Sequence, residues 1–501
     1  MKSIISRQDE VVAVNVERIY SVQWALASLS LSMLMSSLGT SIANVGLPTL
    51  AHVFAASFQE VQWIVLAYLL AITTLIVSVG RFGDMIGRRR LLLVGIFLFT
   101  AASILCGIAP TLWFLVAARV VQGLGAAILM TLTIAFVGET VPKIKTGSAM
   151  GLLGTMSAIG TALGPSLGGV LITELSWRAI FLINVPLGIL TFFLAHRYLP
   201  VDHQGSKTNL ASFDKVGTLL LALTLTAYAL AMTVGRGNFG SYNMVLLLAA
   251  TFGIGLFVFV EANVASPLIR LGMFHNPVLS ASLAMSAFVS TVMMATLVVG
   301  PFYLSHALGL DAARVGLVLS VGPLVVALTG LPAGRFADRF GAQRMILFGL
   351  IGMSVGCFML SIIPATLGIP GYITPIIVIT VGYSLFQTAN NTVVMTDIHS
   401  DKRGVISGLL NLSRNLGLIT GASVMGTVFT LGSATMDITT ARPEAVAIGM
   451  QITFVVGAIL IVVALIIAFG TYRLTLRNRI LAPEEGALES VKHFETVRRK
   501  I

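Results

Sequence analysis

The chain has 501 residues, 56% of them hydrophobic and only 10% charged. Soluble domains carry about 25% charged residues, so this composition excludes a soluble enzyme, a disordered chain and a disulfide-rich scaffold. The formal net charge of +11 would favour a nucleic-acid partner only if the basic residues formed a patch, and they lie instead between long hydrophobic segments.

Hydrophobic segments long enough to cross a bilayer as helices, about 20 residues each, follow one another along the whole chain. Helix breakers such as Pro110 and the stretch from Pro364 to Pro370 separate them. The first segment is too long for a removable signal peptide, so we expect it to be a transmembrane helix. The predicted fold is all-α and integral to the membrane, with 14 helices near residues 24–45, 62–79, 91–109, 112–137, 147–172, 178–197, 214–234, 243–262, 278–302, 313–333, 345–364, 372–396, 404–431 and 446–471.

The distribution of Lys and Arg orients these helices. If the N-terminus lies in the cytoplasm, the inside segments carry 25 of the 31 Lys and Arg residues and the outside segments carry four. The remaining two, Arg119 and Arg414, lie within predicted helices. This bias follows the positive-inside rule. We therefore expect both termini in the cytoplasm and no nucleic acid as a partner.

A charged motif occurs twice, after the second and after the tenth predicted helix. Gly80-Arg-Phe-Gly-Asp-Met-Ile-Gly-Arg-Arg-Arg90 returns as Gly334-Arg-Phe-Ala-Asp-Arg-Phe-Gly-Ala-Gln-Arg344. Glycines would allow a tight turn and a close approach of helices, and the acids Asp84 and Asp338 could cap a helix or pair with an arginine. The repetition indicates that the chain consists of two related halves.

Eight predicted helices separate the two copies of the motif, so two helices are additional to a pair of six-helix bundles. The expected organisation has five parts: a cytoplasmic tail at 1–23, an N-terminal bundle at 24–199, the two additional helices and their linkers at 200–277, a C-terminal bundle at 278–471, and a cytoplasmic tail at 472–501.

The motif resembles a known signature. Gly80, Asp84, Gly87, Arg88 and Arg89 match the cytoplasmic gating motif of the major facilitator superfamily of transporters. The second copy keeps the glycines and the acid of these positions, and its gating-motif candidates are Gly334 and Asp338.

Two further segments narrow the resemblance. Leu115–Gly125 resembles the fourth-helix motif of the superfamily, and Gly160–Gly169 resembles the fifth-helix motif associated with antiporters. In the latter, glycines at four-residue spacing would form a groove for close helix packing, and a proline would bend the helix. Packing alone is the alternative explanation. The antiporter motif consists of Gly160, Gly164, Pro165, Gly168 and Gly169.

Asn44–Pro48 and Trp177–Gly188 are similar to segments of the 14-helix drug:proton antiporters of the EmrB/QacA type. The resemblance implies the major facilitator fold in a bacterial cytoplasmic (inner) membrane. It also implies multidrug efflux, the export of drugs, dyes or biocides in exchange for protons by alternating access, and hence antibiotic resistance. We expect the proton gradient as the energy source, no cofactor, and a monomer whose partners are small-molecule substrates, protons and the lipid bilayer.

One position departs from the family pattern. The family's first-helix motif usually reads Leu-Asp-x-Thr-x-x-Asn, and this chain has Gly39 where the carboxylate belongs. Since no acid lies near the centre of a predicted helix, the coupling proton is expected on a peripheral acid, first Glu139 and second Asp397, with Arg119 as a relay. The alternatives are ordinary helix-end charges and a structural role for the arginine.

Polar residues on the twelfth and thirteenth predicted helices recur at helical spacing and give each helix one polar face. These faces either hold the bundle together or line a central cavity for substrates near the membrane midplane. The candidate cavity residues are Gln122, Phe386, Gln387, Asn390, Asn391, Asn411, Arg414 and Asn415.

Two alternatives follow from the same residues. Two deep arginines and no deep acid would suit an exporter of neutral or anionic metabolites. A membrane enzyme or a metal site would need clustered His, Asp or Glu, and the histidines are scattered singly. We therefore expect neither catalysis nor a bound metal.

Overall fold

The computed structural model describes residues 2–56, 58–200, 214–233, 240–264, 267–310, 312–396, 402–433 and 442–498, and this part of the chain is all-helical. It contains 14 stretches of helix long and apolar enough to cross a membrane, as the sequence predicts. The helices are α1 (Lys2–Val53), α2 (Phe58–Ile86), α3 (Arg88–Gly107), α4 (Leu112–Thr140), α5 (Thr146–Glu174), α6 (Ala179–Leu182), α7 (Asn184–Tyr198), α8 (Lys215–Thr233), α9 (Ser241–Asn263), α10 (Pro277–Phe302), α11 (Ala312–Phe340), α12 (Ala342–Ile362), α13 (Gly368–Thr396), α14 (Arg403–Gly432) and α15 (Pro443–Arg498).

Local sequence signals set several helix ends. Thr111 caps α4, because its side chain accepts a hydrogen bond from the backbone N–H of Phe114. Asn276 caps α10 in the same way, and Pro277 follows in the first turn, where its missing N–H costs no hydrogen bond. The sixth span is divided between α6 and α7, which Ile183 joins.

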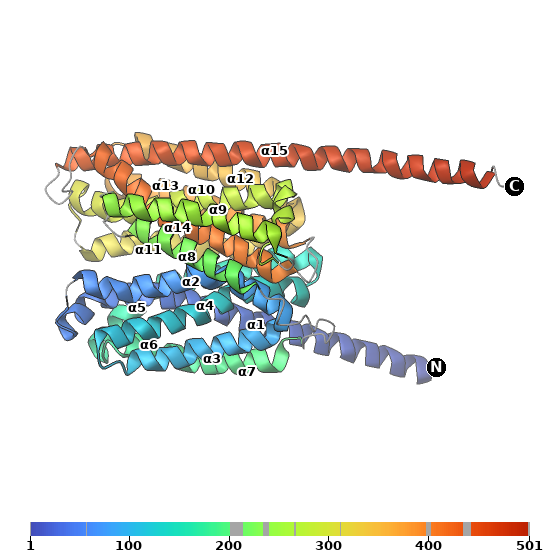
Figure 1. The fold of residues 1–501 in the computed structure, drawn as a ribbon, viewed down its shortest axis with the longest axis horizontal. Helices are drawn as coiled ribbons and strands as arrows, with labels where there is room; N and C mark the ends of the chain where they lie inside the picture. The colour runs from blue at the N-terminus through green and yellow to red at the C-terminus, as the bar shows by residue number, and fades with distance from the viewer. Residues whose placement is uncertain are drawn as a thin grey trace.

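The helices form two bundles, α1–α7 and α10–α15, which occupy the lower and upper halves of Figure 1. Within the first bundle α1 packs on α5 and α4 packs on α2 and α3; within the second α10 packs on α14 and α12 packs on α13. The bundles meet along two seams, where α2 contacts α14 and where α5 contacts α11.

The additional helices α8 and α9 pack against each other beside the bundles. Helix α8 contacts both α2 and α14, and so it lies over the seam between those helices. The hydroxyl groups of Tyr228 on α8 and Thr420 on α14 share a hydrogen bond. The additional pair is thus attached to both halves of the molecule.

Both ends of the chain project from the same side of the molecule, which we call the terminal side (Figure 1). The repeated motif also lies on this side, and most of its residues are helical. Gly80–Ile86 belongs to α2 and Gly334–Phe340 to α11. The turn is a single glycine in each copy, Gly87 with φ 107° and Gly341 with φ 90°, values that L side chains rarely adopt.

Candidate functional site

The acid of the first motif caps a helix of the opposite bundle. Asp84 Oδ1 accepts a hydrogen bond of 3.0 Å from the backbone N–H of Gly404, and Oδ2 accepts one of 3.1 Å from that of Val405. These N–H groups belong to the first turn of α14, where a negative charge is stabilised by the helix dipole. Asp84 therefore links the two bundles at the terminal side.

The acid of the second motif makes the reciprocal link. Asp338 Oδ1 accepts a hydrogen bond of 2.8 Å from the backbone N–H of Gly147, and Oδ2 accepts from the N–H and the hydroxyl of Ser148, at 2.9 and 2.6 Å. These groups lie in the first turn of α5. Each half of the chain therefore supplies a carboxylate that caps a helix of the other half, and we call the two links the crossed caps.

Glycines bring the helix backbones together beside these caps. A Cβ atom on Gly80 would overlap the carbonyl oxygen of Gly404, and one on Gly334 would overlap that of Gly147. Only glycine allows so close a crossing of α2 with α14 and of α5 with α11. The terminal side of the interface is thus tightly closed in this conformation.

Basic residues of the first motif extend the network. Arg88 forms ion pairs with Asp84, at 2.7 Å, and with Glu139 at the end of α4. Arg89 donates to the backbone carbonyl of His196. Glu139, the first expected proton carrier, is therefore connected through Arg88 to the crossed cap of Asp84. Asp397, the second, lies outside the described residues.

Arg119 is completely buried between helices of the first bundle. Its Nε donates to the carbonyl oxygen of Ile64 at 2.9 Å, and its Nη1 donates to Gln122 Oε1 at 2.6 Å. Gln122 in turn donates to Ser103 at 2.8 Å, and the guanidinium carbon lies 4.0 Å from the centre of the Tyr68 ring. Arg119 and Gln122 thus join α2, α3 and α4 and do not reach the cavity described below.

Aromatic rings fill the space beside Gly39. A Cβ atom at this position would lie 3.0 Å from the Phe99 ring and 3.1 Å from the Tyr68 hydroxyl. The Tyr68 hydroxyl donates to the carbonyl oxygen of Ser36 at 2.9 Å, which holds the ring in place. A side chain at position 39 would therefore require the Phe99 ring and the Tyr68 hydroxyl to shift.

The antiporter motif lies on α5 and packs against α1. A Cβ atom on Gly160 would come within 2.5 Å of the carbonyl oxygen of Leu34, and one on Gly164 would overlap the Ser41 side chain. Ser41 donates to the carbonyl oxygen of Gly160 at 3.1 Å. Two motif glycines therefore form the expected packing groove. Gly169 has no atom of another residue within 4 Å of such a Cβ, Gly168 is buried, and the Pro165 side chain is outside the described part.

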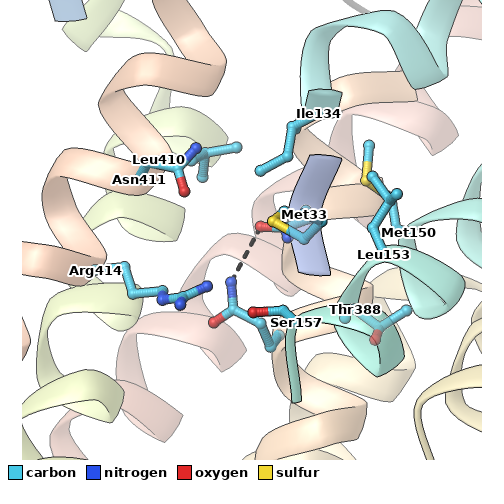
Figure 2. A pocket seen from close by; sticks show the side chains of 12 residues that line it. Met33, Ile134, Met150, Leu153, Ser157, Thr388, Leu410, Asn411 and Arg414 are labelled. Atoms are coloured by element: carbon cyan, nitrogen blue, oxygen red, sulfur yellow. Dashed lines mark hydrogen bonds between the residues drawn. The ribbon is translucent and has the colours of Figure 1, made fainter. Parts of the chain in front are cut away.

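A cavity lies between the bundles, and five helices line it: α1, α4 and α5 from the first half and α13 and α14 from the second. It is narrow, with room for only a few water molecules in this conformation. Its lining residues are Met33, Ile134, Met150, Leu153, Gly154, Ser157, Gln387, Thr388, Asn391, Leu410, Asn411 and Arg414. In Figure 2, Arg414 and Asn411 lie on one side, facing the apolar side chains of Ile134, Met150 and Leu153.

The polar wall of this cavity is incompletely satisfied. Gln387 Nε2 donates to Asn391 Oδ1 at 3.2 Å, and Asn411 Nδ2 donates to the carbonyl oxygen of Ser407 at 3.0 Å. Gln387 Oε1 is buried without a hydrogen-bond partner among the described residues. Arg414 forms no hydrogen bond or ion pair there, and none of the lining residues is acidic.

The structure places the other cavity candidates elsewhere. Phe386 is fully buried and packs against Gly349 on α12, and Asn390 donates to the carbonyl oxygen of Ser282 on α10 at 3.3 Å. Asn415 is on α14 but does not line the cavity. The sequence interpretation missed the walls from α1, α4 and α5, although Met150, Leu153 and Ser157 share one helix face at spacings of three and four residues.

A buried pair of acids lies where α8 begins and α9 ends. Asp214 Oδ1 accepts from the backbone N–H of Gly217 at 2.7 Å, and Glu261 Oε2 accepts from that of Ile269 at 3.2 Å. The other oxygen of each carboxyl is buried without a partner in the described part. A Cβ atom on Gly217 would meet both of these oxygens, so they face each other.

Comparisons with known proteins agree with this architecture. Residues 29–422 match the model of the Major Facilitator Superfamily. The chain is 31% identical over 424 residues to the multidrug resistance protein Stp of Mycobacterium tuberculosis, which covers 82% of this chain and 77% of that protein. It is 30% identical over 407 residues to the riboflavin transporter RibZ of Clostridioides difficile, which covers 81% of this chain and 87% of that protein.

Solved structures share the fold at low sequence identity. The human organic anion transporter MFSD10 superposes with a TM-score of 0.63 at 13% identity, over 89% of this chain and 99% of that one. The proton:xylose symporter XylE superposes with a TM-score of 0.62 at 16% identity, over 88% and 95%. The chain therefore belongs to the Major Facilitator Superfamily, and its 14 membrane-spanning helices and multidrug-efflux relatives agree with the 14-helix drug-transporter group within it.

Proposed function

We propose that this protein is a proton-coupled exporter of drugs, dyes or biocides in the bacterial cytoplasmic membrane, which works by alternating access and confers antibiotic resistance. The observation that carries the proposal is the cavity, which five helices from both bundles line. A site between two bundles is exposed to either side when the bundles rock against each other. Relatives named as a multidrug resistance protein and a drug efflux pump support the choice of cargo.

The crossed caps provide the switch that such a cycle needs. Opening at the terminal side requires that Asp84 leaves α14 and that Asp338 leaves α5. A cap contributes about 0.5–2 kcal/mol, so two caps favour the closed conformation without locking it. The terminal side would be the cytoplasmic one, because the positive-inside rule places 25 of the 31 Lys and Arg residues on the side of both termini.

For the proton we propose Glu139 first and Asp397 second, with Arg119 as the expected relay. Glu139 pairs with Arg88, which also pairs with Asp84, so a proton on Glu139 would remove one partner of the arginine that supports a crossed cap. This arrangement connects proton binding with the balance between the two conformations.

Dye efflux driven by an imposed pH gradient in proteoliposomes tests this function. We expect wild-type protein to move a neutral dye against its gradient, and Glu139→Gln with Asp397→Asn to abolish the pH dependence. Glu174→Gln is the matched control, since Glu174 is exposed at the opposite end of α5. Full proton-driven transport by the double variant would overturn the coupling assignment, and no proton-driven transport of any dye by wild type would overturn the function.

A second candidate is an exporter of neutral or anionic metabolites. Arg414 in a cavity without acids favours it, as does the relative named as a riboflavin transporter. Growth of an efflux-deficient strain that expresses the chain, on cationic biocides and on anionic compounds, separates the two candidates.

A further inference from the structure

We propose that the cavity selects organic anions: Arg414 binds one negatively charged group of the substrate, and Gln387 Oε1 accepts a hydrogen bond from an N–H or O–H group beside that charge. The substrate class is thus an amphiphilic monoanion with a neighbouring donor. The proposal rests on the proposed function only in that the cavity is the substrate site.

The two deep arginines of the chain show the difference between a structural and a binding role. Arg119 is held by protein groups, which are a backbone carbonyl, the Gln122 amide and the Tyr68 ring, and only its Nη2 has no hydrogen-bond partner among the described residues. Arg414 is half-buried in the cavity wall and has no such partner among the described residues. A cation at membrane depth is costly unless it is paired, so the unpaired guanidinium favours an anion in the cavity.

The neighbouring amides define the second feature of the ligand. Gln387 is oriented by its hydrogen bond to Asn391, which leaves Oε1 buried and unpartnered beside the cavity. Asn411 uses its N–H₂ group on Ser407, so its oxygen is also the group left for a ligand. Since a buried acceptor without a partner is unfavourable, a substrate that brings a donor is preferred.

The opposite wall fits the apolar part of such a molecule. Ile134, Met150 and Leu153 face Arg414 across the cavity, and Met33 lies between the two walls (Figure 2). Methionine side chains are flexible and polarizable, so they adapt to ring systems of different shape. The cavity therefore selects its ligand by charge more strongly than by shape.

Two dyes that differ by one anionic group test the proposal. 8-Anilinonaphthalene-1-sulfonate carries a sulfonate next to an N–H donor, and N-phenyl-1-naphthylamine is the same ring system without the sulfonate. We expect Arg414→Gln to weaken binding of the sulfonate dye to the full chain in nanodiscs at least tenfold, and binding of the neutral dye less than twofold. Arg414→Lys should retain part of the affinity, and Arg178→Gln, at an exposed arginine, should change neither.

A second variant, Gln387→Glu, tests the proposal even if Arg414→Gln fails to fold. Gln387→Glu leaves Arg414 in place but puts a carboxylate beside it, so it should weaken the sulfonate dye at least tenfold and admit the cation rhodamine 6G. Equal losses for both dyes in Arg414→Gln, or an unchanged affinity for the sulfonate dye in both variants, would overturn the proposal.

Measurements of binding and of transport distinguish the anion site from proton-coupled export. If the sulfonate dye binds in an Arg414-dependent way but no pH gradient drives its transport, the anion site stands and proton-coupled export fails. If the neutral dye is exported by a proton gradient and the sulfonate dye neither binds nor moves through Arg414, export stands and the anion site fails.

Discussion

Replacement of Asp84 by Asn tests whether the crossed caps set the balance between the two conformations. The amide has one acceptor oxygen, so it keeps at most one of the two hydrogen bonds to Gly404 and Val405, and it loses the ion pair with Arg88. The side chains of Asp84 and Arg88 are only 2% and 7% exposed, so solvent screens this change weakly. The perturbation removes charge and leaves the shape nearly unchanged.

The magnitude follows from these contacts. A charge at a helix N-terminus contributes about 0.3–1 kcal/mol at the surface and about 2 kcal/mol when partly buried. We expect a loss near the upper end, about 1.5–2 kcal/mol, for Asp84→Asn. Since 1.4 kcal/mol is a factor of ten, opening at the terminal side should become about 10–30-fold more favourable.

Distance measurements between two spin labels report this opening. Ile144 and Phe340 are exposed, lie at the terminal side and belong to different bundles. With cysteines at these positions and the buried Cys106 and Cys357 replaced, the population with the longer distance should increase in Asp84→Asn.

Two controls complete the measurement. Asp338→Asn removes the other crossed cap and should shift the population in the same direction, whereas Glu174→Gln should leave it unchanged. An unchanged distance distribution together with unchanged dye efflux in both aspartate variants, at matched expression, would refute the role of the caps.

Further predictions concern helix packing, the cavity and the buried acids. Gly80→Ala should reduce efflux severalfold at matched expression, because its Cβ would overlap the facing backbone, whereas Gly316→Ala meets no atom within 4 Å and should be neutral. Gly39→Asp should overpack the first bundle by about 1–3 kcal/mol and lower its thermal stability in detergent; an unchanged melting temperature would contradict this. In a cysteine-free background, Gln387→Cys should react with a water-soluble thiol reagent and be protected by substrate, and an absence of labelling from both sides would exclude it from the cavity. Glu261→Gln should raise the melting temperature above that of wild type at pH 9 and leave it similar at pH 5, since repulsion from the facing carboxylate requires that both be ionised; a lower melting temperature at pH 9 would contradict this.

The membrane helices were predictable because their signal is carried by composition over about 20 residues and needs no tertiary information. The segment 112–137 corresponds to α4, Leu112–Thr140, and the other spans match comparably. The repeat of Asp84 and Asp338 was also visible. That each acid caps a helix of the opposite bundle was not, because the cap partners are separated by about 190 and 320 residues.

The cavity was only partly predictable, since the sequence gives the polarity of a helix but not the neighbour that each side chain meets. Asn390 and Asn391 are adjacent on α13, yet one donates to α10 and the other lines the cavity. Arg119 and Arg414 are both deep arginines in the sequence. Only the packing shows that the first meets the carbonyl oxygen of Ile64, from a different helix, and that the second has no such partner in the part of the chain that the structure describes.

The position of α8 makes the two seams of the molecule unequal toward the lipid. Helix α8 covers the seam between α2 and α14 and contacts both helices, whereas within the described residues neither α8 nor α9 makes a comparable contact with α5 or α11. When the bundles rock, α8 must slide on one of its two neighbours, so the covered seam stays shielded from acyl chains. If an apolar substrate enters from the bilayer, the α5–α11 flank is therefore the less obstructed route to the cavity.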